Sequence, residues 1–108
     1  MIPEAYKKFL REILERTNNG EVQWENDYDQ SLYLRTKTAT VELGQYSDAD
    51  AELSFYYFKY NNYSKKKDAS FRVSHLEDDY AIMEKLYTVA AASATNVGDE
   101  LKDFLKEL

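Results

Sequence analysis

Residues 51 to 63 constrain the fold more than any other stretch, because they combine strand-like alternation with a run of aromatic side chains. Six aromatic residues fall within the nine positions from Phe55 to Tyr63. Successive side chains of a strand point to opposite faces of its sheet. One face of this strand would carry Leu53, Phe55 and Tyr57. The other would carry Tyr56, Phe58 and Tyr60. Both faces are therefore aromatic, and a small domain needs only one of them for its core.

The length and composition predict one globular domain. The 108 residues are close to the common domain size and can enclose one hydrophobic core. The hydrophobic fraction of 44% and the charged fraction of 31% are ordinary for a globular protein and too apolar for a disordered chain. Ten tyrosines suit an interface, although tyrosine is also a good strand former. We expect a single α+β domain over residues 1–108.

The net charge of −6 favours some partners over others. Nucleic-acid backbones and anionic membranes are negative, so the charge fits either a basic protein partner or nothing beyond solubility. The sequence has no cysteine, which excludes disulfides, thiolate catalysis and cysteine metal sites. It has neither an apolar leader nor a run of membrane-spanning length, and it therefore predicts a cytoplasmic protein.

The N-terminal residues predict an amphipathic helix. Pro3 is tolerated in a first turn, and Glu4 complements the positive end of the helix dipole. Apolar residues then recur with helical spacing at Tyr6, Phe9, Leu10, Ile13 and Leu14. The sequence Asn18-Asn19-Gly20 tolerates left-handed conformations and should end the helix. A helix that ends in Thr17-x-x-Gly20-x-x-x-Trp24 resembles many small bacterial or phage reading frames, a likeness that implies no function.

The middle of the chain predicts an antiparallel meander of four or five strands. Alternation marks strands near residues 22–25, 31–35, 38–43, 53–60 and 71–73. Residues 26–29, 44–50 and 61–70 are polar and should form turns. Short connections exclude parallel pairing, which needs long crossovers. Residues 31–35 and 38–43 form either two strands or one bent strand, because Thr36-Lys37 lacks the glycine or asparagine of a tight hairpin.

The C-terminal third predicts a long helix or a helix pair packed on the sheet. Ser74-x-x-Glu77 is a capping box. The apolar residues that follow are Met83, Leu86, Ala90, Ala94, Val97, Leu101, Phe104 and Leu108. One continuous helix would be about 45–50 Å long and would overhang strands of about 17–20 Å. Either residues 95–98 break the helix and residues 99–108 fold back, or the helix continues and its distal end packs on another chain. The unbroken spacing favours continuity.

Residues that could support catalysis or metal binding do not form a recognisable site. His75 is the only histidine and has no neighbouring nucleophile in the sequence. Asp48-x-Asp50-x-Glu52 resembles the start of a calcium loop, but no glycine follows at the sixth position and Lys59 replaces the bidentate glutamate. We therefore expect no enzymatic activity, no cofactor and no metal.

The outward face of the sheet is the candidate protein-binding site. If the helices cover the face with Leu32, Leu34, Val41, Phe55, Phe71 and Val73, the other face carries aromatic residues that a partner could contact. The candidate binding residues are Tyr33, Tyr56, Phe58, Tyr60 and Tyr63. If the helices instead lie on opposite faces, both faces are core, and the sequence does not decide between the two arrangements.

The leading hypothesis is a small, acidic, non-enzymatic protein-binding domain, similar in size and charge to inhibitor, immunity or chaperone proteins. Homodimerisation through the aromatic face or the distal C-terminal helix is a linked hypothesis. Two alternatives belong to other classes. Tyr63 with Lys65 to Lys67 could contact single-stranded nucleic acid, which the overall charge opposes. The acidic turns could instead form the carboxylate site of a small hydrolase.

Overall fold

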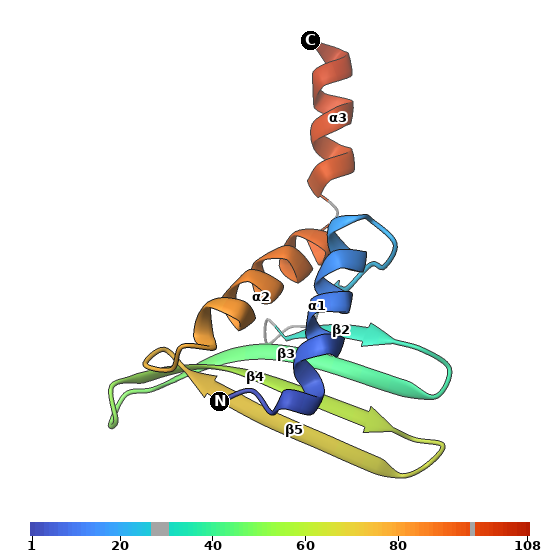
Figure 1. The fold of residues 1–108 in the computed structure, drawn as a ribbon. Coiled ribbons are helices and arrows are strands. Elements are labelled where there is room, and N and C mark those ends of the chain that lie inside the picture. Colours follow the sequence, from blue (N-terminus) through green and yellow to red (C-terminus); the bar gives the residue numbers. More distant parts are fainter. Residues whose placement is uncertain (27–30, 96) are drawn as a thin grey trace.

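The computed structural model describes residues 1–26, 31–95 and 97–108, and the predicted turn at residues 26–29 lies largely outside them. Helix α1 (Glu4–Asn18) precedes a five-stranded sheet, and helices α2 (Tyr80–Thr95) and α3 (Val97–Glu107) follow it (Figure 1). The strands are β1 (Glu25–Asn26), β2 (Leu32–Arg35), β3 (Ala39–Asp48), β4 (Leu53–Asn62) and β5 (Lys67–Ser74). The predicted α+β class and the antiparallel meander are confirmed.

The sheet is a simple meander, because every strand pairs antiparallel with its neighbours in the sequence. β2 and β3 are separate strands joined by a tight turn that has neither glycine nor asparagine. The hydroxyl of Thr36 takes over their role by accepting hydrogen bonds from the N–H groups of Thr38 and Ala39 at 3.4 and 3.2 Å. The backbone N–H of Thr36 also donates to the carbonyl of Ala39 at 2.9 Å.

β3 and β4 are longer than the sequence predicted. Each has ten residues, and Gly44 lies inside β3 opposite Tyr57 instead of opening a turn. The turn itself follows Asp48, whose carboxylate accepts the N–H groups of Asp50 and Ala51 at 3.1 and 3.2 Å. Glu52 completes this turn with a φ of 55°. The carboxylate of Asp48 therefore stabilises the turn between β3 and β4.

Helices α1 and α2 lie on the same face of the sheet (Figure 1). From α1, the ring of Tyr6 contacts the rings of Phe58 and Phe71, with centroids 5.9 and 5.5 Å apart. From α2, Tyr80 and Tyr87 contact Tyr56 at 5.0 and 5.3 Å. The question that the sequence left open is settled: one face of the sheet is covered by helices.

The predicted assignment of faces in β4 is wrong, because the covered face carries Tyr56, Phe58 and Tyr60. Directly opposed residues of antiparallel strands share a face. Phe58 is paired with Leu43 and Phe71, and Tyr56 is paired with Val73. The aromatic residues of β4 occur on both of its faces, so alternation alone could not select the inner one. The register places Phe55 and Tyr57 outward.

Trp24 fastens α1 to α2 beside the sheet. Its side chain is 1% exposed, and its indole N–H donates to the hydroxyl of Thr17 in α1 at 3.0 Å. Its backbone N–H donates to the hydroxyl of Ser93 in α2, also at 3.0 Å. Among the described residues, no buried side-chain nitrogen or oxygen lacks a hydrogen-bond partner, as expected for a folded protein.

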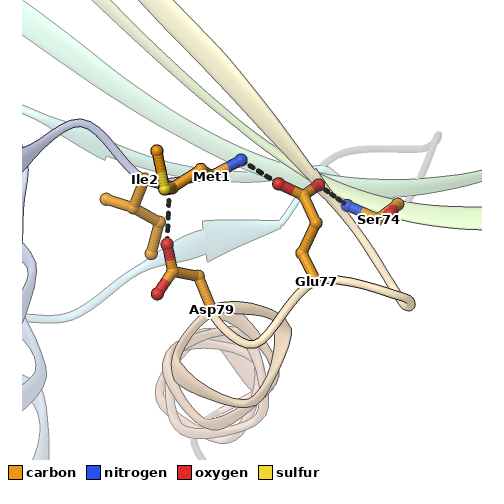
Figure 2. Close-up of polar contacts among 5 residues, drawn as sticks. All are labelled: Met1, Ile2, Ser74, Glu77 and Asp79. Carbon is orange, nitrogen blue, oxygen red and sulfur yellow. Dashed lines mark hydrogen bonds and ion pairs between the residues drawn. The ribbon is translucent and has the colours of Figure 1, made fainter.

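The predicted capping box does not cap α2, because one of its hydrogen bonds forms in the turn that precedes the helix. The carboxylate of Glu77 accepts the N–H of Ser74 at 2.7 Å, while the first helical residue is Tyr80. Glu77 also accepts a hydrogen bond from the α-amino group of Met1, and Asp79 accepts one from the backbone N–H of Ile2 at 2.8 Å (Figure 2). The amino group of Met1, followed by the Ser74 N–H, holds the pKa of Glu77 below its usual value. These bonds join the segment before α1 to the start of α2.

Only the first of the two C-terminal helices rests on the sheet. α2 buries Met83, Leu86 and Ala90, whereas α3 stands away from the sheet and meets the end of α2 (Figure 1). α3 does not fold back along α2. Asn96 lies outside the described residues, so the predicted continuity at that position is not described. Among the helices that the structure describes, none has the length and apolarity needed to cross a bilayer.

Candidate interaction surfaces

The outer face of the sheet, which neither α1 nor α2 covers, combines aromatic and charged residues. Cross-strand pairs set them in rows. One row joins Tyr33, Glu42, Lys59 and Ser70, and the next joins Gly44, Tyr57 and Arg72. A third pair, Tyr46 and Phe55, lies nearer the β3–β4 turn. This face is an alternating surface of rings, cations and hydroxyl groups.

The most apolar ring of the outer face is covered by the chain itself. Phe55 is only 7% exposed, because the guanidinium of Arg72 lies 4.6 Å from its centroid and Tyr46 stacks on it at 5.0 Å. Arg72 also donates a hydrogen bond to the hydroxyl of Tyr46 at 2.8 Å. The cation thus has two partners within the sheet, and Phe55 offers little surface to a partner.

Tyr57 fills the space above Gly44. A Cβ at position 44 would lie 2.1 Å from Cζ of Tyr57, so only glycine permits this approach. The Tyr57 hydroxyl donates to Glu42 at 2.6 Å, and the ammonium of Lys59 lies 5.2 Å from the Tyr57 ring. The Tyr57 ring therefore covers Gly44 within β3, and its hydroxyl group is hydrogen-bonded to Glu42.

The candidate binding residues do not form one surface. Tyr56 and Phe58, at 7% and 1% exposure, belong to the core, and Tyr60 packs against it. Burial, as the main cause, raises the pKa of Tyr56 to about 12. Tyr33 is half-buried on the outer face, where the guanidinium of Arg35 lies 5.0 Å from its ring. Tyr63 is 47% exposed beside the β4–β5 turn, and its hydroxyl bonds to Thr40.

His75, the acidic residues and the lysine-rich turn are the remaining candidate groups from the sequence. The described residues contain no cluster of three or more histidine, cysteine or acidic side chains that could hold a metal ion. Nδ1 of His75 accepts the backbone N–H of Ser54 at 3.1 Å, which fixes the turn before α2. Lys65 and Lys66 are exposed in the β4–β5 turn and Lys67 begins β5, where the nucleic-acid hypothesis placed its contact.

Helix α3 carries the largest group of uncovered apolar side chains. Leu101 (58% exposed), Phe104 (59%) and Leu105 (67%) lie in the helix, and Leu108 (88%) directly follows its last residue, Glu107. Their spacing of three and four residues puts them on one side of the helix, which we call the α3 stripe. The sequence signal for it was the apolar repeat that continues beyond the length of the sheet. No part of the described chain covers this stripe.

A groove between α1 and α2 was not predicted from the sequence. It encloses about 400 Å³ and is lined by Lys7, Arg11, Leu14, Ile82 and Lys85. Ile82, in the first turn of α2, is 40% exposed, whereas the next residue, Met83, is buried. The sequence signal for this groove was Ile82, an apolar residue that does not fit the helical spacing of the buried residues of α2. We call this depression the α1–α2 groove.

Comparison of the chain with protein-family models, with curated proteins and with solved structures finds no match.

Proposed function

We propose that this chain is a non-enzymatic protein-binding domain whose helix α3 docks onto a partner. The observation that carries the proposal is the α3 stripe. Single exposed leucines are normal on protein surfaces, but a contiguous row on one helix marks an interaction site. An amphipathic helix set in an apolar groove is a common mode of peptide recognition.

The length of α3 supports a docking role. It has 11 residues, and an isolated helix shorter than about 12–15 residues is marginal in water. Its leucines and phenylalanine receive no stabilisation from the sheet. Packing against a partner would supply the tertiary contacts from which helices in proteins gain most of their stability.

The area of the α3 stripe sets the expected affinity. Full burial of a leucine or phenylalanine contributes about 1.5–3 kcal/mol, so four such side chains give about 6–12 kcal/mol. Association costs about 4–15 kcal/mol in lost motion and side-chain ordering. One helix stripe alone therefore supports modest binding, and a tighter complex would need contacts from a second surface.

The outer face of the sheet is the weaker candidate for the docking site. Its main apolar ring, Phe55, is covered by Arg72 and Tyr46. A partner would have to displace these contacts before it gained new ones. We therefore propose α3, in place of the tyrosine-rich face of the sheet, as the protein-binding surface.

A binding experiment with matched leucine variants tests the proposal. The full chain is immobilised and exposed to a lysate of its native host as wild type, as Leu105→Gln and as Leu76→Gln. Leu105 and Leu76 are similarly exposed, at 67% and 74%, but Leu76 lies in the turn before α2. We expect Leu105→Gln to lose a partner that both wild type and Leu76→Gln retain. Equal capture by all three would refute the docking role of α3.

A further inference from the structure

We propose that the partner surface for α3 is the α1–α2 groove of a second copy of this chain, an inference that rests on the proposed docking role of α3. The chain carries an uncovered apolar helix and an apolar groove with cationic walls. Two copies could each insert α3 into the groove of the other. The same contact would then be made twice around a two-fold axis, which closes the assembly as a dimer.

The groove has the chemistry of a receptor for an amphipathic helix with an acidic edge. Leu14 from α1 and Ile82 from α2 supply its apolar part, and the remaining lining residues are cationic. Lys7 is paired with Glu4 at 3.0 Å, so Arg11 and Lys85 are the cations that an incoming carboxylate would meet. Three cations around one groove are a local exception on a chain with a net charge of −6.

The α3 stripe has a matching acidic edge. Glu100 and Glu107 each precede a leucine of the stripe by one position, and seven residues correspond to about two helical turns. Both glutamates therefore lie along the same edge. Lys102 borders the other edge, where its flexible stem can direct the ammonium group to solvent. Acidic residues on the helix and cations on the groove fix one orientation of docking.

The groove of a second copy fits α3 better than the groove of the same chain. Ile82 and Lys85 lie near the start of α2, whereas α3 begins beyond its end, about 20 Å further along the helix. α3 then continues away from α1 and the sheet (Figure 1). A helix that projects from the domain is placed to reach another molecule.

The oligomeric state of the full chain tests this inference. Sedimentation velocity over a range of concentrations should show a monomer–dimer equilibrium for wild type. Leu105→Gln in the helix and Ile82→Gln in the groove should each raise the dissociation constant about tenfold or more, since each removes an apolar contact that is made twice. Leu76→Gln is the control and should leave the constant unchanged. Circular dichroism establishes that each variant is folded.

Mixing the variants identifies the surfaces that meet. A Leu105→Gln copy keeps an intact groove, and an Ile82→Gln copy keeps an intact α3. Their mixture restores one wild-type contact and should associate more strongly than either variant alone. Association of Ile82→Gln as strong as that of wild type would overturn the inference in favour of contact between two α3 helices.

Charge exchange provides an independent check. Arg11→Glu with Lys85→Glu should weaken the dimer, and adding Glu100→Lys with Glu107→Lys should restore it. A wild-type chain that stays monomeric at all concentrations would overturn the inference. If Leu105→Gln nevertheless lost a captured protein, the proposed function would stand with a different partner.

Discussion

The outer sheet face and α3 both direct apolar side chains away from the core, but only one of them leaves those side chains uncovered. On the sheet, Phe55 is followed by five more aromatic residues up to Tyr63, yet it is only 7% exposed. On α3, Phe104 is 59% exposed. The number of aromatic residues in a stretch of sequence therefore does not identify an interaction surface. The side chains that cover or expose each ring in the structure do identify it.

The sheet covers its own rings because its strands bring long cations beside them. Arg72 is directly across from Tyr57 and lies over Phe55, a placement that a β-ladder fixes through register. α3 has no paired strand beside it, so no cross-strand register places a cation over its apolar side chains. Amphipathic separation therefore exposes the leucines of α3, and cross-strand pairing covers Phe55 on the sheet.

The largest expected loss of stability comes from the inner face of the sheet and distinguishes it from the outer face and from α3. Phe58 is 1% exposed and contacts Tyr6, Phe9 and Phe71. Phe58→Ala should lower the free energy of unfolding by about 3–5 kcal/mol, through lost burial and a cavity. Urea denaturation measures this change. A loss below about 1 kcal/mol would mean that Phe58 lies on an open face, as the sequence had suggested.

Alkaline pH tests the burial of Tyr56 on the same inner face. Its pKa rises from the model-peptide value of 10.0 to about 12 in the folded chain, mainly because burial disfavours the phenolate. A group whose folded pKa is raised contributes stability in full below pH 10, and the contribution is lost as the pH rises toward 12. The loss should be on the order of 2 kcal/mol.

Tyr56→Phe should remove this pH dependence. The measurement is thermal or urea unfolding between pH 9 and 12, with wild type as the reference. Absorbance of the phenolate gives a second reading, since the wild-type minus Tyr56→Phe difference should titrate near pH 12. A difference that titrates at pH 10 would contradict a buried Tyr56.

Gly44→Ala tests the contact that protects the outer face. The added Cβ would meet the ring of Tyr57 at 2.1 Å, so the ring must move. We expect a loss of about 1–3 kcal/mol in unfolding free energy. In a Tyr57→Ala background the same change should be neutral or stabilising, because alanine is less flexible than glycine in a strand. Equal effects in the two backgrounds would show that the ring does not cover Gly44.

Arg72→Ala should convert part of the sheet into a surface that resembles α3. It removes the cation over Phe55 and the hydrogen bond to Tyr46, at a cost of about 1 kcal/mol. Binding of a fluorescent apolar dye should increase because Phe55 becomes accessible. Lys37→Ala, in the exposed turn between β2 and β3, is the control. Unchanged dye binding would show that Arg72 does not shield the ring.

The sequence predicted the fold class and the position of α1 because these follow from periodicity and end signals. The stripe from Tyr6 to Leu14 and the sequence Asn18-Asn19-Gly20 place α1 correctly. The limits of β3 and β4 were predicted too short, because Gly44 and Asn61 are ordinarily turn residues. Their strand conformation depends on cross-strand partners such as Tyr57 that sequence position alone does not reveal.

The candidate site could be predicted only in part. The α3 stripe was present in the sequence as an apolar repeat longer than the sheet. The inner face of β4 could not be chosen, since Phe55 and Tyr57 on one side match Tyr56 and Phe58 on the other in hydrophobicity. Register with Leu43 and Val73 makes that choice. The α1–α2 groove requires the relative placement of two helices that are distant in the sequence.

The smallest expected effect concerns α3 and completes the comparison. Phe104→Ala should change the unfolding free energy by less than about 0.5 kcal/mol in dilute solution, because the side chain is 59% exposed and lies outside the core. The effect should grow with protein concentration, since a partner that binds only the folded form stabilises it by mass action. Thermal unfolding of wild type and Phe104→Ala across a concentration series measures both quantities. A large, concentration-independent loss would place Phe104 in an intramolecular contact and remove the distinction between α3 and the core.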